Sequence, residues 1–130
     1  MIVYGKIIGK ARPRFTRQGH VYTPKTTKDY EKSIRSEYIK ENGTRYTGAI
    51  KVDIRACFEI PKSYSKKQKF EASRGFLAPT KKPDADNIAK VVLDALNGVA
   101  FEDDKNVVSL NVKKEYTVGD EHLMVDVYGS

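Results

Sequence analysis

The sequence predicts an α+β fold, in which one domain spanning residues 1–130 packs helices on a mixed, mainly antiparallel β-sheet. Two observations predict it. Segments with the alternation of strands and segments with helical periodicity follow one another in the order strand, helix, strand, helix, helix, strand, strand. The chain of 130 residues, 39% hydrophobic and 32% charged, suits one globular core, and no repeat or linker divides it.

The N-terminal part is expected to form a strand, a basic connection and a helix. Residues 2–8 are rich in β-branched side chains, which predicts a strand. Residues 10–25 mix prolines and a glycine with five bases, which is typical of an extended loop or hairpin. The next segment, to about Lys40, repeats an aromatic or aliphatic residue every four positions, so it is expected to be an amphipathic helix that ends at Asn42-Gly43.

The remaining elements follow from the same two periodicities. Residues 49–60 alternate strictly between apolar and polar, which predicts a half-buried strand. Residues 65–74 open with a serine followed three positions later by glutamine, a helix-capping pattern. Residues 87–96 carry apolar side chains on one helical face. Residues 108–113 and 123–127 alternate again around a turn signal, and we expect them to pair as an antiparallel hairpin.

Positive charge is concentrated in two segments of a chain whose formal net charge is +7. Residues 1–28 contain seven Lys or Arg and no acid, and residues 62–82 contain seven against one acid. Segregated charge of this kind indicates a polyanionic partner, with nucleic acid the commonest. The alternative is a basic surface that only aids solubility. Candidate DNA contacts in or beside these segments are Arg12, Arg14, Arg17, Lys66, Lys67 and Lys82.

The expected compartment and partners follow from sequence patterns that the chain does not contain. No apolar run approaches the roughly 20 residues of a membrane span, and the N-terminus has no signal-peptide pattern. The single cysteine, Cys57, fits a reducing compartment. We therefore expect a cytoplasmic protein with no membrane partner and no small-molecule cofactor.

Acidic residues gather in one short stretch of this basic chain. Six of the seventeen acids lie between Asp84 and Asp104, and Lys90 is the only base among them. Pro83 prevents an earlier helix start, so Asp84 and Asp86 lie at the helix entrance, where both side chains can turn toward one point. If the strand that begins near residue 107 pairs beside this entrance, the carboxylates of residues 102–104 join them.

Three or four carboxylates around one point suit Mg²⁺, with Mn²⁺ as an alternative. On a basic surface, such a metal site indicates phosphodiester hydrolysis. The simpler interpretation is that Asp84 or Asp86 only caps the helix and that Asp86 and Lys90 form a surface ion pair.

The stretch KPDADNIAKVVLDALNGVAFEDDKNV, residues 82–107, resembles the central signature of the RusA family of Holliday junction resolvases. The shared pattern is D-x-D-N, a lysine four residues after the second aspartate, an apolar helix ending in D-A-L, and a D-D pair before a strand. The segment RPRFTRQGHVYTP resembles a basic segment of phage and prophage members more weakly.

The resemblance implies a RusA-like fold and a role for each acidic position. Asp84, Asp86 and Asp104 would be the essential carboxylates that bind Mg²⁺, and Asp103 an additional ligand. Lys90 would steady the scissile phosphate or the leaving oxygen.

The resemblance also implies the substrate and the assembly. The protein would be a homodimer that nicks branched DNA at four-way junctions in recombination and repair, encoded by a bacterial genome, a prophage or a phage. The alternatives are a non-catalytic nucleic-acid-binding protein, and a nuclease for flaps or forks.

Overall fold

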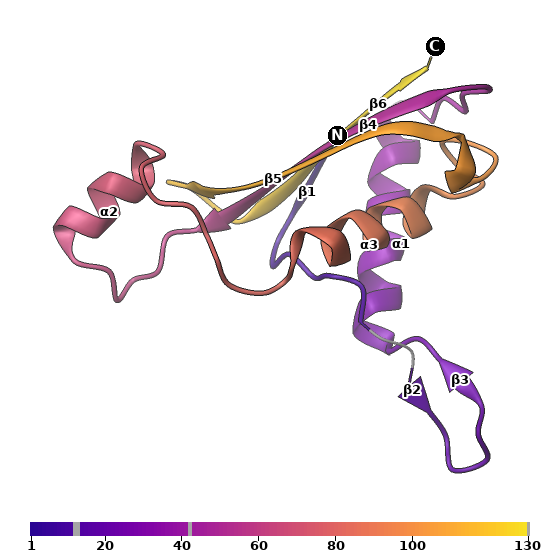
Figure 1. Cartoon of the computed structure of the whole chain (residues 1–130), viewed down its shortest axis with the longest axis horizontal. Coiled ribbons are helices and arrows are strands. Elements are labelled where there is room, and N and C mark those ends of the chain that lie inside the picture. Colours follow the sequence, from indigo (N-terminus) through magenta and orange to yellow (C-terminus); the bar gives the residue numbers. More distant parts are fainter. Residues whose placement is uncertain (12–13, 42, 130) are drawn as a thin grey trace.

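The computed structural model describes residues 1–11, 14–41 and 43–129. One four-stranded sheet forms a layer, and two helices cover one of its faces (Figure 1). A third helix and a small two-stranded hairpin project from this body. The elements are β1 (Ile2–Tyr4), β2 (Arg14–Phe15), β3 (Val21–Tyr22), α1 (Lys25–Glu41), β4 (Ile50–Glu59), α2 (Lys66–Ser73), α3 (Ala85–Leu96), the 3₁₀ turn η1 (Asp104–Asn106), β5 (Val107–Thr117) and β6 (His122–Gly129).

The sheet has the order β1-β6-β4-β5 and is built around β4. β4 pairs antiparallel with β6 and parallel with β5, and β6 pairs antiparallel with β1. The apolar positions of β4 point into the core, as its alternation predicts, and Ile50, Val52 and Ile54 are fully buried. The predicted α+β class with a mixed, mainly antiparallel sheet is confirmed.

The predicted hairpin between the last two strands is wrong. β4 lies between β5 and β6, and residues 118–121 cross over its end, where Glu59 pairs with Thr117 and Cys57 pairs with His122. An alternating pattern shows which face of a strand is buried but not which strand lies next to it. β4 lies inside the sheet, where both of its edges are paired.

Glu121 holds this crossing together. Its carboxylate accepts hydrogen bonds from the backbone N–H groups of Ile7, at 2.9 Å, and Glu59, at 3.2 Å. Its backbone oxygen accepts a third from Gly5. β1 is shorter than the predicted strand over residues 2–8, because Gly5 adopts a φ of +116° that turns the chain out of the sheet.

The helices follow the local patterns closely. α1 buries Tyr30, Ile34 and Tyr38 on one stripe. Its predicted end includes Asn42, which lies outside the described residues. The capping box at the start of α2 is present, with Ser65 and Gln68 each accepting the other's backbone N–H.

α3 lies in the connection between the parallel strands β4 and β5, since parallel neighbours need a long crossover. Its apolar face is buried against the sheet and α1. The chain after β1 runs tightly across the start of α3: a Cβ on Gly9 would lie 2.6 Å from the Cβ of Pro83. The backbone N–H of Lys10 also donates to the oxygen of Asn87, at 2.9 Å.

Replacing Glu121 with alanine should lower the free energy of unfolding by about 1–3 kcal/mol, because two backbone N–H groups lose their acceptor. Urea denaturation measures this. Asp120→Ala is the matched control, since Asp120 is the exposed neighbour of Glu121. Equal midpoints for the two variants would contradict the role assigned to Glu121.

Candidate active site

The two aspartates at the start of α3 are exposed and differ in what they bind. Asp84 is the N-cap residue, in extended conformation with φ −69° and ψ 154°, but among the described residues its side chain accepts no capping hydrogen bond. Asp86 lies in the first turn, and its Oδ1 accepts the backbone N–H of Asn87 at 3.0 Å. Capping therefore does not account for Asp84, whose carboxylate points to solvent without a helical partner.

Lys90 pairs with Asp94 one turn further along α3, with 3.3 Å between Nζ and Oδ1. In the described part of the chain, no ion pair joins it to Asp86, so the alternative of an Asp86–Lys90 surface pair is wrong. Lys90 pairs with Asp94 because Lys10 fixes this carboxylate from the other side, with 3.1 Å between Nζ of Lys10 and Oδ2 of Asp94.

Asp103 and Asp104 are neighbouring carboxyls before β5. Asp103 caps η1 by accepting the backbone N–H of Lys105 at 3.1 Å, and this bond, followed by the interaction with the Asp104 side chain, lowers the pKa of Asp103. The interaction with the Asp103 side chain is the largest cause that raises the pKa of Asp104. Two adjacent carboxyls disfavour a second negative charge, so the two pKa values move apart.

The structure brings Asp104 to the later turns of α3. The positive charge of Lys90 lowers the pKa of Asp104 and the negative charge of Asp94 raises it, so both lie within electrostatic range. The parallel register explains this position. Ile50 pairs with Val107, so β5 begins beside the start of β4, and α3 runs back to that point from the far end of β4.

Asp84 and Asp86 are not joined to Asp103 and Asp104 in one ligand cage. Among residues 1–11, 14–41 and 43–129, no three acidic, histidine or cysteine side chains are grouped so as to hold a metal ion. The carboxylate oxygens match the ligand preference of Mg²⁺, and the raised pKa of Asp104 reflects the neighbouring Asp103 side chain and the negative charge of Asp94. The donors therefore fit the metal in chemistry, while their arrangement does not form a closed site.

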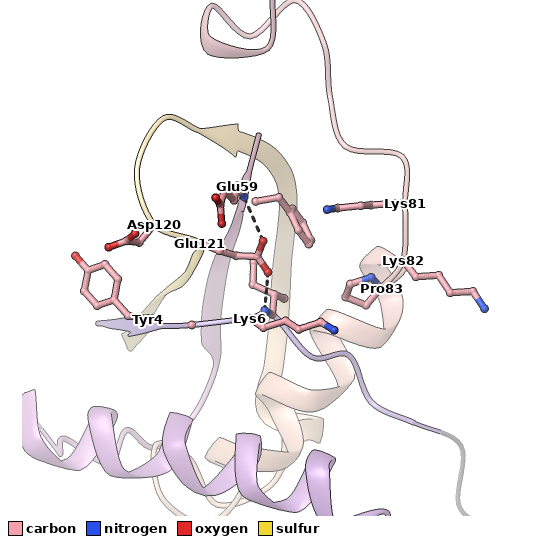
Figure 2. Close-up of a pocket in the computed structure, with 11 residues that line it drawn as sticks. Tyr4, Lys6, Glu59, Lys81, Lys82, Pro83, Asp120 and Glu121 are labelled. Atoms are coloured by element: carbon pink, nitrogen blue, oxygen red, sulfur yellow. Dashed lines mark hydrogen bonds between the residues drawn. The ribbon is translucent and has the colours of Figure 1, made fainter. Parts of the chain in front are cut away.

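A hollow of about 740 Å³ opens beside the start of α3 (Figure 2). Lys6, Lys81 and Lys82 line it, and Figure 2 shows Lys81 directed into it and Lys82 extending away from it. A second hollow of about 590 Å³ shares Lys6 and Lys82 and reaches Asp84. Sequence reasoning named Lys82 as a DNA contact but not Lys6 or Lys81, because membership of a basic segment does not tell which lysines line a hollow.

The other predicted DNA contacts lie on two projecting parts of the molecule (Figure 1). Arg17 is exposed in the β2–β3 hairpin, and Lys66 and Lys67 are exposed in the first turn of α2. Arg14 lies in β2, whereas Arg12 is outside the described residues. The hairpin and α2 are far apart, so these bases flank the body of the protein rather than forming one patch.

Comparisons with known proteins give a family and a relative for this chain. Residues 5–128 match a family model described as endodeoxyribonuclease RusA. The chain is also 40% identical over 123 residues, 88% of its length and 85% of the relative's, to the uncharacterized protein YqaN of Bacillus subtilis (strain 168). In the described residues, no helix is long and apolar enough to cross a membrane.

Asp103→Asn should lower the pKa of Asp104 toward that of an ordinary aspartate. The substitution removes the negative charge that makes the second ionisation unfavourable. Carboxyl ¹³C chemical shifts, followed through an acid titration of the metal-free protein, measure this pKa. Glu102→Gln, which changes an exposed acid one position earlier, is the control. A pKa of Asp104 that stays raised in Asp103→Asn would show that the pair is not coupled.

Proposed function

This chain belongs to the RusA family of endodeoxyribonucleases, and we propose that it is a divalent-metal-dependent enzyme that resolves four-way DNA junctions by paired symmetric nicks. The observation that carries the proposal is the family match over residues 5–128, which contains every candidate acid and Lys90. A role in recombination and repair, for a bacterial, prophage or phage genome, follows from that substrate.

We propose Asp84, Asp86 and Asp104 as the residues that hold Mg²⁺, with Asp103 as an additional ligand and Mn²⁺ as an alternative ion. When bound, the metal would supply an activated water and offset the charge that develops on the phosphate. Asp104 lies next to Asp103, and a bound cation would offset the negative charge of these two neighbouring carboxylates.

Lys90 is proposed to act on the scissile phosphate or on the leaving oxygen. Its side chain is 57% exposed although it is paired with Asp94, so it remains accessible to a bound strand. An ammonium group near the reacting phosphate stabilises the charge of the transition state more than that of the ground state.

The flanking bases would bind the DNA arms through their phosphates. The β2–β3 hairpin offers Arg17, and α2 offers Lys66 and Lys67. The basic N-terminal segment adds Arg12 and Arg14, and Lys82 lies beside the start of α3. Contacts of this kind position a duplex without reading its sequence, which suits an enzyme that recognises the shape of a junction.

A homodimer would supply the two nicks. Each chain has one acidic region, whereas resolving a junction requires two cuts related by symmetry. The structure offers apolar positions that the core does not use: on the outer strand β5, Val108 is 71% exposed and Leu110 is 43% exposed. A second copy could cover these side chains.

Two alternative functions predict different results with DNA. A non-catalytic binding protein would hold DNA equally well with metal or chelator and leave it intact. A flap or fork nuclease would cut three-armed substrates in preference to four-way junctions. The uncommitted carboxylate of Asp84 favours the enzyme over the binding protein, because a helix cap alone does not require it.

Asp84→Asn, Asp86→Asn and Asp104→Asn should each abolish junction cleavage while junction binding persists. Each removes a ligand charge, whereas bases on other elements provide most of the affinity. Gel-shift and cleavage assays on the same labelled junction separate the two effects. Asp120→Asn, an exposed acid outside α3 and η1, should cut normally. Wild-type cleavage by any of the three variants would exclude that residue from the site.

Light scattering of the DNA-free protein should give the mass of two chains, because the proposed symmetric nicks require two sites. Replacing Val108 and Leu110 together with glutamate should yield monomers if β5 forms the contact. Val118→Glu, which alters an equally exposed apolar residue in the turn before β6, is the control. A monomer that still makes paired nicks, without pairing on the junction, would contradict the dimer.

A further inference from the structure

Four charged side chains from three parts of the chain form a connected network next to α3. The Nζ of Lys10 lies 3.0 Å from Oε1 of Glu31 and 3.1 Å from Oδ2 of Asp94. The other oxygen of Asp94, Oδ1, lies 3.3 Å from Nζ of Lys90. Asp94 therefore bridges two lysines, one on the segment after β1 and one on its own helix.

The inner part of this network is withdrawn from water. The side chains of Lys10, Glu31 and Asp94 are 17%, 13% and 21% exposed, against 57% for Lys90. Burial alone would lower the pKa of Lys10, but the hydrogen bonds and charges of Glu31 and Asp94 raise it overall. Lys10 consequently stays charged and holds the Asp94 carboxylate in one orientation.

This anchor reduces the rotamer freedom that is lost when Asp94 pairs with Lys90. An isolated pair four residues apart on an exposed helix is weak, because both side chains lose rotamer freedom to form it. Here one partner is already fixed by Lys10 and Glu31, so only Lys90 has freedom left to lose. The backbone bond from Lys10 to Asn87 and the close approach of Gly9 to Pro83 fix the anchor relative to α3.

We propose that Asp94 is a positioning residue that fixes the ammonium group of Lys90 on the open face of α3, and that Lys10 and Glu31 are its anchor. This rests on the proposed function, in which Lys90 acts on the phosphate. The network gives Lys90 a set position before DNA arrives, while more than half of its side chain remains exposed for the substrate.

The kinetic consequence is a loss of turnover without a loss of DNA affinity. Asp94→Asn keeps the shape of the side chain but removes the charge that holds Lys90. Because small displacements of a catalytic group are costly, kcat should fall about ten- to a hundredfold. KM for the junction should stay close to the wild-type value, since the hairpin and α2 supply the phosphate contacts.

A double-mutant cycle tests whether Asp94 acts through Lys90. Cleavage of a labelled four-way junction is measured for wild type, Asp94→Asn, Lys90→Ala and the double variant. We expect the double variant to be no slower than Lys90→Ala, because a positioning residue has no effect once its target is gone. Additive losses, or wild-type kcat in Asp94→Asn, would overturn the proposal.

Two further variants separate positioning from folding. Glu31→Gln leaves the contact of Asp94 with Lys90 in place but loosens Lys10, so it should lower kcat less than Asp94→Asn and have no effect in the Lys90→Ala background. Glu37→Gln removes the exposed ion pair with Lys40 on α1 and should leave kcat unchanged. Thermal unfolding of each variant shows whether it is folded when assayed.

The hold of Asp94 on the side chain of Lys90 can be measured without metal or DNA. In nuclear magnetic resonance spectra of ¹³C-labelled protein, the Cε methylene signal of Lys90, assigned by its loss in Lys90→Ala, should show restricted motion in wild type and greater mobility in Asp94→Asn. Unchanged mobility would overturn the proposal. Wild-type protein that cuts no DNA but shows the restricted signal would instead reject the proposed function and leave the hold of Asp94 on Lys90 standing.

Discussion

The parallel pairing of β4 with β5 is the constraint on which the arrangement of the candidate site depends. Strands that run side by side in the same direction must be joined by a long crossover, and here α3 fills it. The crossover gives α3 one face buried in the core and one face open to solvent, and the acids lie on or beside the open face. The same pairing brings Asp104 within electrostatic range of Lys90 and Asp94.

The acids of this basic protein differ in what offsets their charge. Asp94 is paired with both Lys10 and Lys90. Asp103 and Asp104 are neighbours, which raises the pKa of Asp104. Among the described residues, the side chain of Asp84 accepts no capping hydrogen bond. Asp94 therefore needs no further cation, whereas Asp84 and Asp104 are suited to a ligand that brings positive charge.

Local patterns predicted what depends on neighbouring residues, and failed where distant segments meet. The burial of β4, the capping box of Ser65 and the apolar face of α3 all follow from residues a few positions apart. The placement of β4 between β5 and β6 does not follow from neighbouring residues, because an alternating pattern does not show which strand lies next to it. The anchoring of Asp94 was equally hidden, since Lys10 and Glu31 belong to separate segments that only the fold brings together.

The central claim is that this fold cuts four-way DNA junctions with the help of a divalent metal. The direct measurement incubates wild-type protein with a labelled four-way junction, and with linear duplexes of the same arm sequences, in Mg²⁺ and in chelator. The account predicts two symmetric nicks that convert the junction to duplexes in Mg²⁺, uncut junction in chelator, and intact linear duplexes in both. Junctions that are bound but never cut in Mg²⁺, or linear duplexes cut as readily as junctions, would contradict it.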